Sequence, residues 1–324
     1  MATVETIRGP VDSSELGTTY MHEHVFVLSP ELLQNYPAGW DEEERVTDAV
    51  YKLTELRNLG VETIVDPTVV GLGRYIPRLQ RINTQVDINI VAATGIYTYN
   101  DIPFRFHYSG PDTLLGGDEP MTDLFIQDIR EGIAGTGVKA AFLKCAIDAP
   151  GLTPGVERVM RAVAHAHRAT GVPITVHTSV HNEGGKVVQR VLREEGVDLS
   201  RVVIGHSGDS TDLDYLKSLA DEGSLLGMDR FGIDSLLPFE QRVETVVKLC
   251  QAGYSERMVL SHDASCYIDW FPIQVLAVGA PNWHYRHISE DVLPALRERG
   301  VSDEQIRTML VGNPRRYFEN VGAY

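Results

Sequence analysis

Two histidines one residue apart, His22 and His24, lie in the stretch TTYMHEHVFV, which spans residues 18–27. This stretch has β-branched and aromatic residues in a period of two and contains no Gly or Pro, which predicts a β-strand. Residues i and i+2 of a strand point to the same face, so both imidazoles would share one face and Glu23 would point away from them. Two imidazoles so placed could chelate one metal ion. The alternative is an incidental polar cluster on an exposed edge.

Further side chains able to bind a metal or a substrate stand near the ends of six later predicted strands. Imidazole and carboxylate together suit borderline divalent metals, so zinc, manganese, cobalt or iron could bind them. The residue types permit a two-metal site in which one ion takes His22, His24 and Asp263 and the other takes His177 and His206. The full set at the strand ends is Tyr97 and Tyr99, Lys144, His177, His206, Asp229 with Arg230, and His262 with Asp263.

The two ions of such a site need a bridging ligand, and a modified lysine can supply one. Burial beside two cations would lower the pKa of a lysine, and the neutral amine could add carbon dioxide to form a carbamate with two oxygens. Lys139 and Lys144 both lie on the predicted strand 138–148 but have opposite parity, so only one can face the site. Lys144 is nearer the carboxyl end and is therefore the predicted bridge. The alternative is a lysine that reaches solvent past the rim.

The elements that would position these residues alternate between strand and helix along the whole chain. Apolar runs predict eight strands, at 18–27, 61–66, 88–95, 138–148, 173–180, 201–209, 224–232 and 258–265. Helical periodicity predicts a helix after each of them, at 41–59, 75–84, 121–133, 154–170, 185–195, 211–223, 239–252 and 289–299, with a further helix pair at 303–321. Eight such units in a single domain, 1–324, predict an α/β fold, the (β/α)₈ TIM barrel, whose sites lie at the carboxyl ends of the strands. An open doubly wound sheet would need a glycine-rich turn after the first strand, and MHEHVF does not resemble one.

The composition narrows the class of protein. The 324 residues carry a formal net charge of −16, which disfavours binding to nucleic acid or to an anionic membrane surface. The three cysteines, Cys145, Cys250 and Cys266, are odd in number and far apart, so no disulfide framework is expected. Residues 1–17 lack the pattern of a signal peptide, and no apolar stretch reaches membrane-spanning length. We therefore expect a soluble cytoplasmic protein that binds neither nucleic acid nor a membrane.

The combination of HxH on the first strand, Lys on the fourth, His on the fifth and sixth, and Asp on the eighth resembles the amidohydrolase superfamily. More narrowly, the chain is similar to the phosphotriesterase-like lactonases, including the phosphotriesterase homologues of mycobacteria and rhodococci. The motifs that carry this resemblance are MHEHVF, DPTVVGLGRYIP, ATGIYTY, GVPITVHT, VVIGHSGDS, GMDRFG and LSHDAS, and they cover nearly the whole chain. Many members have Cys where this chain has Ser265, which is expected to alter packing in the last loop and not the chemistry.

The resemblance implies a binuclear metal centre at the carboxyl ends of the strands, with zinc as the expected ion. His22, His24 and Asp263 would bind the more buried ion, and His177 and His206 would bind the more exposed one. A carboxylated lysine at position 144 and a hydroxide would bridge the two. The resemblance also implies a homodimer.

The chemistry implied for this site is hydrolysis. Two cations would lower the pKa of a bridging water from about 15.7 toward about 7, and the resulting hydroxide would attack a carbonyl carbon or a phosphorus atom. Asp263 would take up the proton and pass it to the leaving alkoxide. Tyr97 would donate a hydrogen bond to the oxygen under attack, and Arg230 would lie near the substrate. The alternatives are a Tyr97 ring that only packs over the site and an Arg230 that forms a salt bridge with Asp229 or Asp234.

Substrate choice is expected to depend on the loops after the seventh and eighth strands. The last loop spans residues 266–287. It shows no clear helical periodicity, and a loop of this length in a compact domain is usually functional. An apolar channel favours a lactone with an aliphatic tail, such as an N-acyl-homoserine lactone or a γ/δ-lactone, with weak activity on organophosphates. For the function of the protein, the alternatives are a dedicated phosphotriesterase and a non-catalytic scaffold of the same fold. For the loop, the alternatives are a dimer contact and a small separate core. Residues predicted to line the channel are Tyr99, Cys266, Tyr267, Ile268, Trp270, Phe271, Ile273, Val275 and Leu276.

Overall fold

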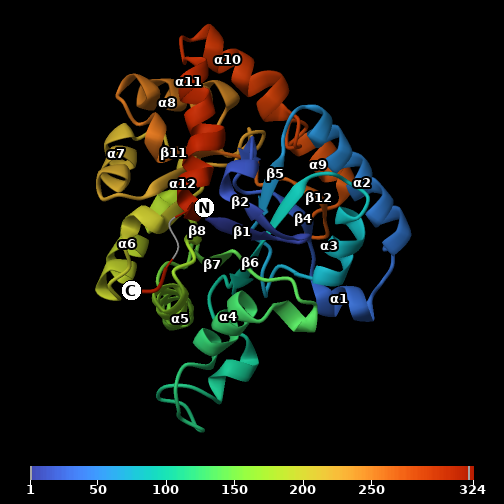
Figure 1. The fold of residues 1–324 in the computed structure, drawn as a ribbon, viewed down its shortest axis with the longest axis vertical. Helices are drawn as coiled ribbons and strands as arrows, with labels where there is room; N and C mark the ends of the chain where they lie inside the picture. Colours follow the sequence, from blue (N-terminus) through green and yellow to red (C-terminus); the bar gives the residue numbers. More distant parts are fainter. Residues whose placement is uncertain (1, 320–321) are drawn as a thin grey trace.

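The computed structural model describes residues 2–319 and 322–324, and its centre is a parallel barrel (Figure 1). Eight strands pair in the order β11-β10-β9-β8-β7-β6-β5-β3. The backbone N–H of Met21, next to β3, donates to the carbonyl of Leu260 on β11 at 3.3 Å, which brings the two edge strands together. The predicted (β/α)₈ barrel is confirmed. The strand bounds are β3 Thr19–Tyr20, β5 Thr63–Asp66, β6 Asn89–Gly95, β7 Phe142–Ile147, β8 Ile174–Thr178, β9 Val202–Gly205, β10 Leu225–Met228 and β11 Met258–Leu260.

Helices surround the barrel on its outside (Figure 1). The longest ones agree with the prediction because their ends are marked in the sequence. In α5, for example, the Thr153 side chain accepts a hydrogen bond from the N–H of Val156, Pro154 occupies the first turn, and Gly171 ends the helix in the left-handed conformation. The α-helix bounds are α1 Pro30–Asn35, α2 Glu42–Asn58, α3 Ile76–Asn83, α4 Pro120–Arg130, α5 Pro154–Thr170, α6 Gly184–Glu194, α7 Leu213–Asp221, α8 Phe239–Gln251, α9 Ile273–Gly279, α10 Leu293–Glu298, α11 Asp303–Arg307 and α12 Asn313–Glu319.

Apolar side chains fill the barrel and leave its carboxyl end to polar ones. Inward-facing residues of the strands, such as Val65, Phe142 and Val259, form one cluster with Tyr317 and Phe318 of α12. The antiparallel hairpin of β1 (Thr3–Thr6) and β2 (Gly9–Asp12) adds Val4 to this cluster. A second, larger cluster packs the helices against the outside of the strands. The interior is therefore a packed core, as in other barrels of this type, and a site has room only at the rim.

The first predicted strand, 18–27, is interrupted, which corrects the prediction. The strand β3 ends at Tyr20, and β4, His24–Val27, leaves the barrel to pair in parallel with β12, Ser265–Ile268. Between them the backbone bonds alternate between the two neighbouring strands: the N–H of Glu23 donates to the carbonyl of Val65 at 3.0 Å, while the N–H of Met21 donates to Leu260. His22 therefore lies in a break of the strand at the barrel rim.

Other differences arise where the sequence pattern is short or mixed. The strand predicted at 138–148 begins only at Phe142, so Lys139 precedes it. The helix α9 lies within the segment 266–287, for which no helix was predicted, and α1 lies between the predicted elements 18–27 and 41–59. The helix α9 has apolar residues on both faces, so it lacks the period that predicts a helix. The helix predicted at 289–299 begins as a π-helical turn at Ile288–Val292, and a second such turn, Thr308–Gly312, lies within the predicted pair at 303–321. Residues 320–321 of that pair lie outside the described residues.

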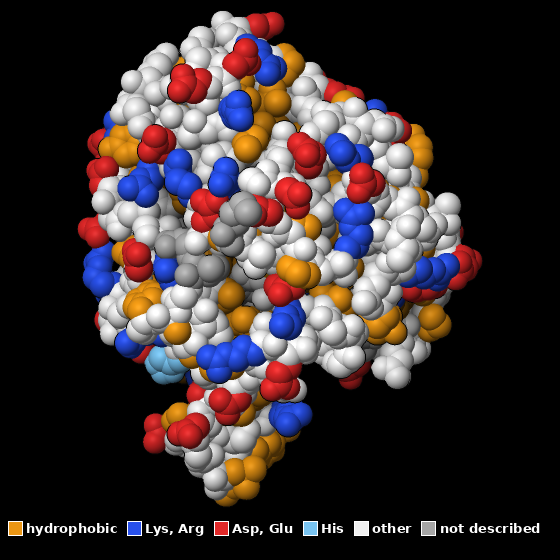
Figure 2. Space-filling model, in the orientation of Figure 1, with side chains coloured by type: hydrophobic (Ala, Val, Ile, Leu, Met, Phe, Trp, Pro, Cys, Tyr) orange, Lys and Arg blue, Asp and Glu red, His pale blue; other side chains and the backbone are white. Residues whose placement is uncertain are grey.

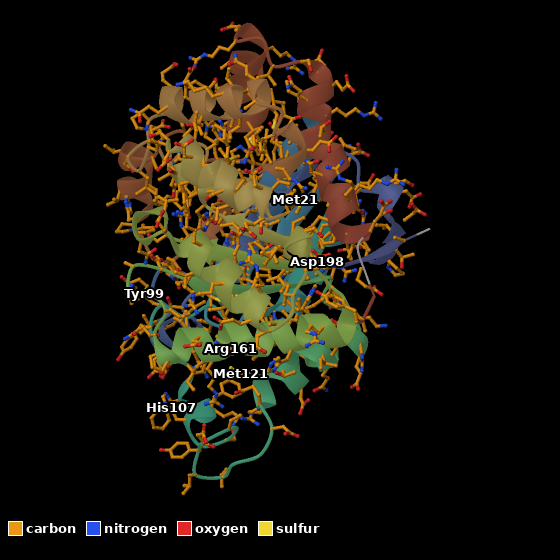
Figure 3. All side chains as sticks on the ribbon, turned by 90° about the vertical axis from the view of Figure 1, so that its left-hand side faces the viewer. Met21, Tyr99, His107, Met121, Arg161 and Asp198 are labelled. Carbon is orange, nitrogen blue, oxygen red and sulfur yellow. The ribbon has the colours of Figure 1, made fainter. Side chains whose placement is uncertain are left out.

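One segment projects from the barrel. Residues 98–119, between β6 and α4, extend below the barrel in Figure 1, and apolar side chains gather at their tip in Figure 2. Figure 3 shows His107 on this projection, below Met121 of α4. Leu114, Leu115 and Phe104 are 83%, 73% and 73% exposed. Within the described residues, no helix is both long enough and apolar enough to span a bilayer.

Candidate metal centre

The six residues predicted as metal ligands meet at the carboxyl end of the barrel, where Asp263 lies among three histidines. Oδ1 of Asp263 is 3.3 Å from Nε2 of His22 and 3.2 Å from Nε2 of His24. Its Oδ2 is 3.9 Å from Nε2 of His206, which directly follows β9. His22, His24 and Asp263 form a group whose ligand atoms are close enough together to hold one metal ion.

The remaining two predicted ligands lie on neighbouring strands. Nδ1 of His177, on β8, is 2.8 Å from Nε2 of His206. Nζ of Lys144, on β7, is 3.3 Å from Nε2 of His22. All four histidines and the lysine are buried. The tertiary structure thus brings six residues from across the sequence into one cluster.

Asp229, directly after β10, orients two of the histidines. Its Oδ2 is 3.1 Å from Nδ1 of His22, and its Oδ1 is 2.9 Å from Nδ1 of His206. The same Oδ1 accepts a hydrogen bond from the backbone N–H of His206 at 2.7 Å. A carboxylate accepts only, so both imidazoles carry their proton on Nδ1 and keep Nε2 free toward the cluster.

The other two histidines are oriented in a similar way. Nδ1 of His24 is 2.7 Å from Oγ1 of Thr68, whose own hydroxyl donates to Asp66 and therefore accepts from the histidine. Nε2 of His177 is 3.0 Å from Oδ2 of Asp148, which leaves Nδ1 of His177 free toward the cluster. Hydrogen bonds of this kind fix the tautomers of metal-binding histidines.

These tautomers create an arrangement that suits a cation. Burial lowers the pKa of His22 to about 4 and also lowers the pKa values of His177 and His206, so these rings are neutral. The free lone pairs of His177 and His206 then face each other, and that of His24 faces the Asp263 carboxylate. Buried acceptors that face one another without a donor are unfavourable, and a metal ion among them removes the conflict. The donor set, imidazole nitrogen and carboxylate oxygen, fits zinc or a similar ion.

Burial shifts the Lys144 side chain toward the neutral amine. Its side chain is fully buried, and this burial lowers its pKa to about 8, although the charges of Asp263 and Asp229 act in the opposite direction. An amine with this pKa is partly neutral near pH 7 and so can react with carbon dioxide. The other candidate, Lys139, lies before β7 and is partly exposed.

Arg230, after β10, connects Asp263 to a second carboxylate. Its Nε donates to Oδ2 of Asp263 at 3.1 Å, and its Nη1 donates to Oδ2 of Asp209 at 3.0 Å. Asp209 forms a further ion pair, of 2.7 Å, with the buried Arg242 of α8. The ion pairs of Arg230 are therefore with Asp263 and Asp209, and not with Asp229 or Asp234 as the alternative interpretation had it.

Tyr97 lies beside the cluster, just after β6. The edge of its ring packs against His177, with centroids 5.2 Å apart, and its hydroxyl donates to Oδ2 of Asp148 at 3.5 Å. Burial raises the pKa of Tyr97, so the phenol keeps its proton and remains a hydrogen-bond donor at neutral pH.

A cavity of about 450 Å³ opens onto the cluster. Its polar floor includes all the predicted ligands except His206, together with Tyr97, Asp148 and Arg230. Its wall is apolar and comes mainly from the segment after β10 and from the segment of β12, α9 and the turn that follows, with Val27 of β4 and Leu72 after β5 added to it. The apolar lining residues are Val27, Leu72, Ile233, Leu236, Ile268, Trp270, Phe271, Val275, Leu276, Ala280 and Trp283.

Part of the predicted channel lining is elsewhere in the structure. Cys266 is buried outside the cavity, and Tyr267 packs against Trp40 with ring centroids 5.7 Å apart. Ile273 lies on the outer face of α9, 61% exposed, because a helix directs only some of its residues to the cavity. Tyr99 is 55% exposed at the periphery, away from Met21 in Figure 3. These four residues do not line the cavity, whereas the other five predicted residues do.

The sequence analysis assigned no role to several residues that the structure places around the cluster. Asp229 was located at a strand end without a function, and Asp148, Thr68 and Asp209 were not singled out. Each follows a barrel strand within a few residues, which is the position from which a side chain reaches the rim. Their partners, however, are distant in sequence, so the spacing alone could not identify them.

The chain is similar to known proteins along its whole length. Residues 2–318 match the phosphotriesterase family. The phosphotriesterase homology protein of Mycobacterium tuberculosis is 58% identical over 100% of both chains. The aryldialkylphosphatase of Saccharolobus solfataricus is 43% identical over 95% of this chain and 96% of its own length. The solved structure of the phosphotriesterase from Mycobacterium tuberculosis matches with a TM-score of 0.98, at 58% identity, over 99% of this chain and 100% of that one.

Proposed function

Because the chain belongs to the phosphotriesterase family, we propose that it is a binuclear metal-dependent hydrolase whose main substrates are lactones. The observation that carries this proposal is the cluster of free imidazole lone pairs and a carboxylate on the floor of an apolar cavity. The imidazole and carboxylate groups of the floor suit metal ions, and the apolar side chains of the cavity wall suit the aliphatic part of a neutral ester.

The chain would hold the two cations through residues already in contact. One ion would be held by His22, His24 and Asp263. The other would be held by His177 and His206, and carboxylated Lys144 would hold both ions. When bound, the cations would supply Lewis acidity toward the ester oxygen and would lower the pKa of water. The ions are expected to be zinc, with cobalt, manganese or iron as alternatives.

The protein side chains around the reacting ester have separate tasks. The Asp263 carboxylate takes up the proton released on attack and returns it to the leaving alkoxide, and Arg230 keeps its Oδ2 in place for this transfer. The Tyr97 hydroxyl can turn from Asp148 to donate a hydrogen bond to the carbonyl oxygen, where negative charge develops. The apolar wall excludes bulk water, which strengthens these interactions.

The apolar character of the lining suits a substrate with one long apolar group. A lactone presents a flat reacting carbonyl and a single tail, and the apolar residues of the segment after β10 and of α9 share one cavity. A phosphotriester has three groups around a tetrahedral phosphorus atom. It remains the second candidate because of the relative in Saccharolobus solfataricus that bears the name aryldialkylphosphatase.

If the apolar wall binds the aliphatic tail of the lactone, kcat/KM should rise with tail length across a series of γ-lactones or N-acyl-homoserine lactones. Each added methylene that is buried contributes about 0.8 kcal/mol, or about fourfold, until the cavity is filled. Trp270→Ala should reduce kcat/KM about tenfold for long tails and much less for short ones, because the wall near Tyr97 is then lost. Val278→Ala, on the outer face of α9 and 84% exposed, is the control and should change neither value.

The same assay decides between the two substrate classes. A kcat/KM for paraoxon equal to or above that for the best lactone would reverse the ranking and favour a phosphotriesterase. No hydrolysis of either class by the metal-loaded protein would favour the non-catalytic scaffold. A scaffold would also purify without stoichiometric metal.

We further propose that the protein is a homodimer and that the projecting segment 98–119 takes part in the contact. The segment exposes Phe104, Leu114 and Leu115, and Tyr108 links them: its ring packs against Phe104 and its carbonyl accepts from the N–H of Leu115. Large exposed apolar side chains gathered in one place usually mark an interface. Light scattering after gel filtration should give about twice the 35.9 kDa of one chain. The double variant Leu114→Ser, Leu115→Ser should shift the mass toward the monomer. An unchanged dimer would place the interface elsewhere, and a monomeric wild type would contradict the proposal.

A further inference from the structure

The residue between the two histidines of the first motif, Glu23, has no place in the chemistry described above, yet its side chain is fully buried. It points away from the metal cluster, as the spacing predicted. A buried carboxylate is costly unless its oxygens accept hydrogen bonds or it pairs with a cation. The contacts of Glu23 therefore show what it does.

Four donors surround the Glu23 carboxylate, and all of them come from the segment 261–264. Oε1 accepts from the hydroxyl of Ser261 at 2.8 Å, from the backbone N–H of His262 at 2.9 Å and from Nδ1 of His262 at 2.6 Å. Oε2 accepts from the backbone N–H of Ala264 at 3.1 Å. Nε2 of His262 accepts from the backbone N–H of Ile288, so the His262 ring carries its proton on Nδ1 and is neutral.

The segment that Glu23 holds contains Asp263 in an unfavourable backbone conformation. Asp263 has a φ of +56°, in the left-handed region that residues other than glycine rarely adopt. This conformation turns its side chain into the cluster, where its two oxygens face His22, His24 and Arg230. The backbone must be held on both sides for this strained geometry to persist.

The same network also holds the segment that carries the histidines. The hydroxyl of Ser261, which donates to Glu23, accepts from the backbone N–H of His22 at 2.8 Å. The N–H of Asp263 donates to the carbonyl of His22 at 3.0 Å, and the N–H of His24 donates to the carbonyl of Ala264 at 2.8 Å. At the break in the first strand, the Glu23 carboxylate thus adds side-chain hydrogen bonds to the backbone pairs that join these two segments.

We infer that Glu23 is a positioning residue that sets the geometry between Asp263 and the histidine pair, and this inference rests on the proposed function of that site. A glutamine has the same shape but offers one oxygen and one NH₂ group. The NH₂ group would face the backbone N–H of Ala264 or of His262, so at least one of the four hydrogen bonds is lost. The segment around Asp263 would then move relative to His22 and His24.

The test compares Glu23→Gln with wild type in two measurements, zinc titration of the metal-free protein and lactone kinetics after metal loading. Loss of a group that orients metal ligands costs about 10- to 100-fold, so zinc affinity and kcat should both fall by this factor. KM should change less than twofold, because Glu23 does not line the cavity. Asp128→Asn is the matched control: Asp128 is also buried and accepts hydrogen bonds, from Arg74 and Thr94, but lies on α4 outside the cavity. It should lower the melting temperature without changing zinc affinity or kcat.

The outcomes separate this inference from its alternatives. A Glu23→Gln protein that is less thermostable but keeps wild-type zinc affinity and kcat would overturn the positioning role and leave Glu23 a purely structural residue. If Glu23→Gln does not fold, the variant Ser261→Ala replaces it in the test. This change removes one of the four donors to Glu23 and also the acceptor of the His22 N–H. A loss of zinc affinity of about 3- to 10-fold would support the inference, and no loss would contradict it. If the wild type hydrolyses neither lactones nor phosphotriesters, the proposed function fails, while the zinc titration still tests Glu23.

Discussion

Replacing Lys144 with alanine is expected to give a folded protein that binds far less than two zinc ions per chain and has lost lactone hydrolysis by about three orders of magnitude or more. Binuclear sites stabilise the transition state by several kcal/mol, and each 1.36 kcal/mol corresponds to a factor of ten in rate. Lys144 is the predicted bridge, and its Nζ lies 3.3 Å from Nε2 of His22 in the cluster. The fold should persist because alanine removes a buried charge and leaves the barrel pairs of β7 with β6 and β8 in place.

Two measurements separate a bridging carbamate from a simple loss of packing. Elemental analysis of the purified protein should give about two metals per chain for wild type and clearly less for Lys144→Ala. Reconstitution of the metal-free wild type with zinc and ¹³C-labelled bicarbonate should give a carbamate carbon resonance that is absent from the variant. Lys139→Ala is the control and should behave as wild type, because Lys139 lies before β7 and is partly exposed.

A Lys144→Ala protein that keeps both metals and its rate would contradict the bridging role. The same loss in Lys139→Ala alone would move the role to that residue. Metal retention without activity would show that Lys144 acts in the reaction and not in holding the ions.

Replacing Asp263 with asparagine is expected to reduce kcat by about 10³-fold or more, because in the proposed mechanism one side chain serves as both a metal ligand and the proton acceptor. Its Oδ1 faces Nε2 of both His22 and His24, and its Oδ2 accepts from Arg230. Asparagine keeps the shape but cannot take up a proton, and it leaves the Arg230 guanidinium paired with Asp209 alone. Single-turnover kinetics on metal-loaded protein, with the metal content measured on the same sample, test this expectation.

The metal content distinguishes the two roles of Asp263. If Asp263→Asn still holds both ions at high zinc concentration but is slow, the proton-transfer role accounts for the loss. If it fails to hold the ions, the ligand role dominates. Asp128→Asn again serves as the buried-carboxylate control, and an Asp263→Asn rate within tenfold of wild type would remove Asp263 from the mechanism.

Much of the fold could be predicted because its signals are local. The helix α5, for example, has a clear periodicity and marked ends, and β6 is a nearly continuous apolar run of the kind buried in a parallel sheet. The alternation of eight such units indicates a barrel, and the barrel rule places strand ends at one rim. The positions of His177, His206 and Lys144 at that rim followed from the sequence alone.

What failed to follow from the sequence involves contacts between distant segments. The first strand reads as continuous, but it breaks at 21–23 because its backbone groups find partners on both β5 and β11, more than 40 and 230 residues away. The helix α9 was missed because it has apolar residues both on the face that lines the cavity and on the exposed face. Its sequence therefore lacks the alternation of apolar and polar residues that predicts a helix.

The sequence by itself determined the barrel and the residue types available at its rim, because both depend on patterns within single elements. Only the tertiary structure decided which atoms of those residues face each other. Asp229 orients His22 and His206, Arg230 turns to Asp263 and Asp209 and not to its sequence neighbour Asp229, and Glu23 binds the segment around Asp263. These pairings depend on hydrogen-bond geometry across strands that are neighbours only after folding, and that information is absent from residue spacing.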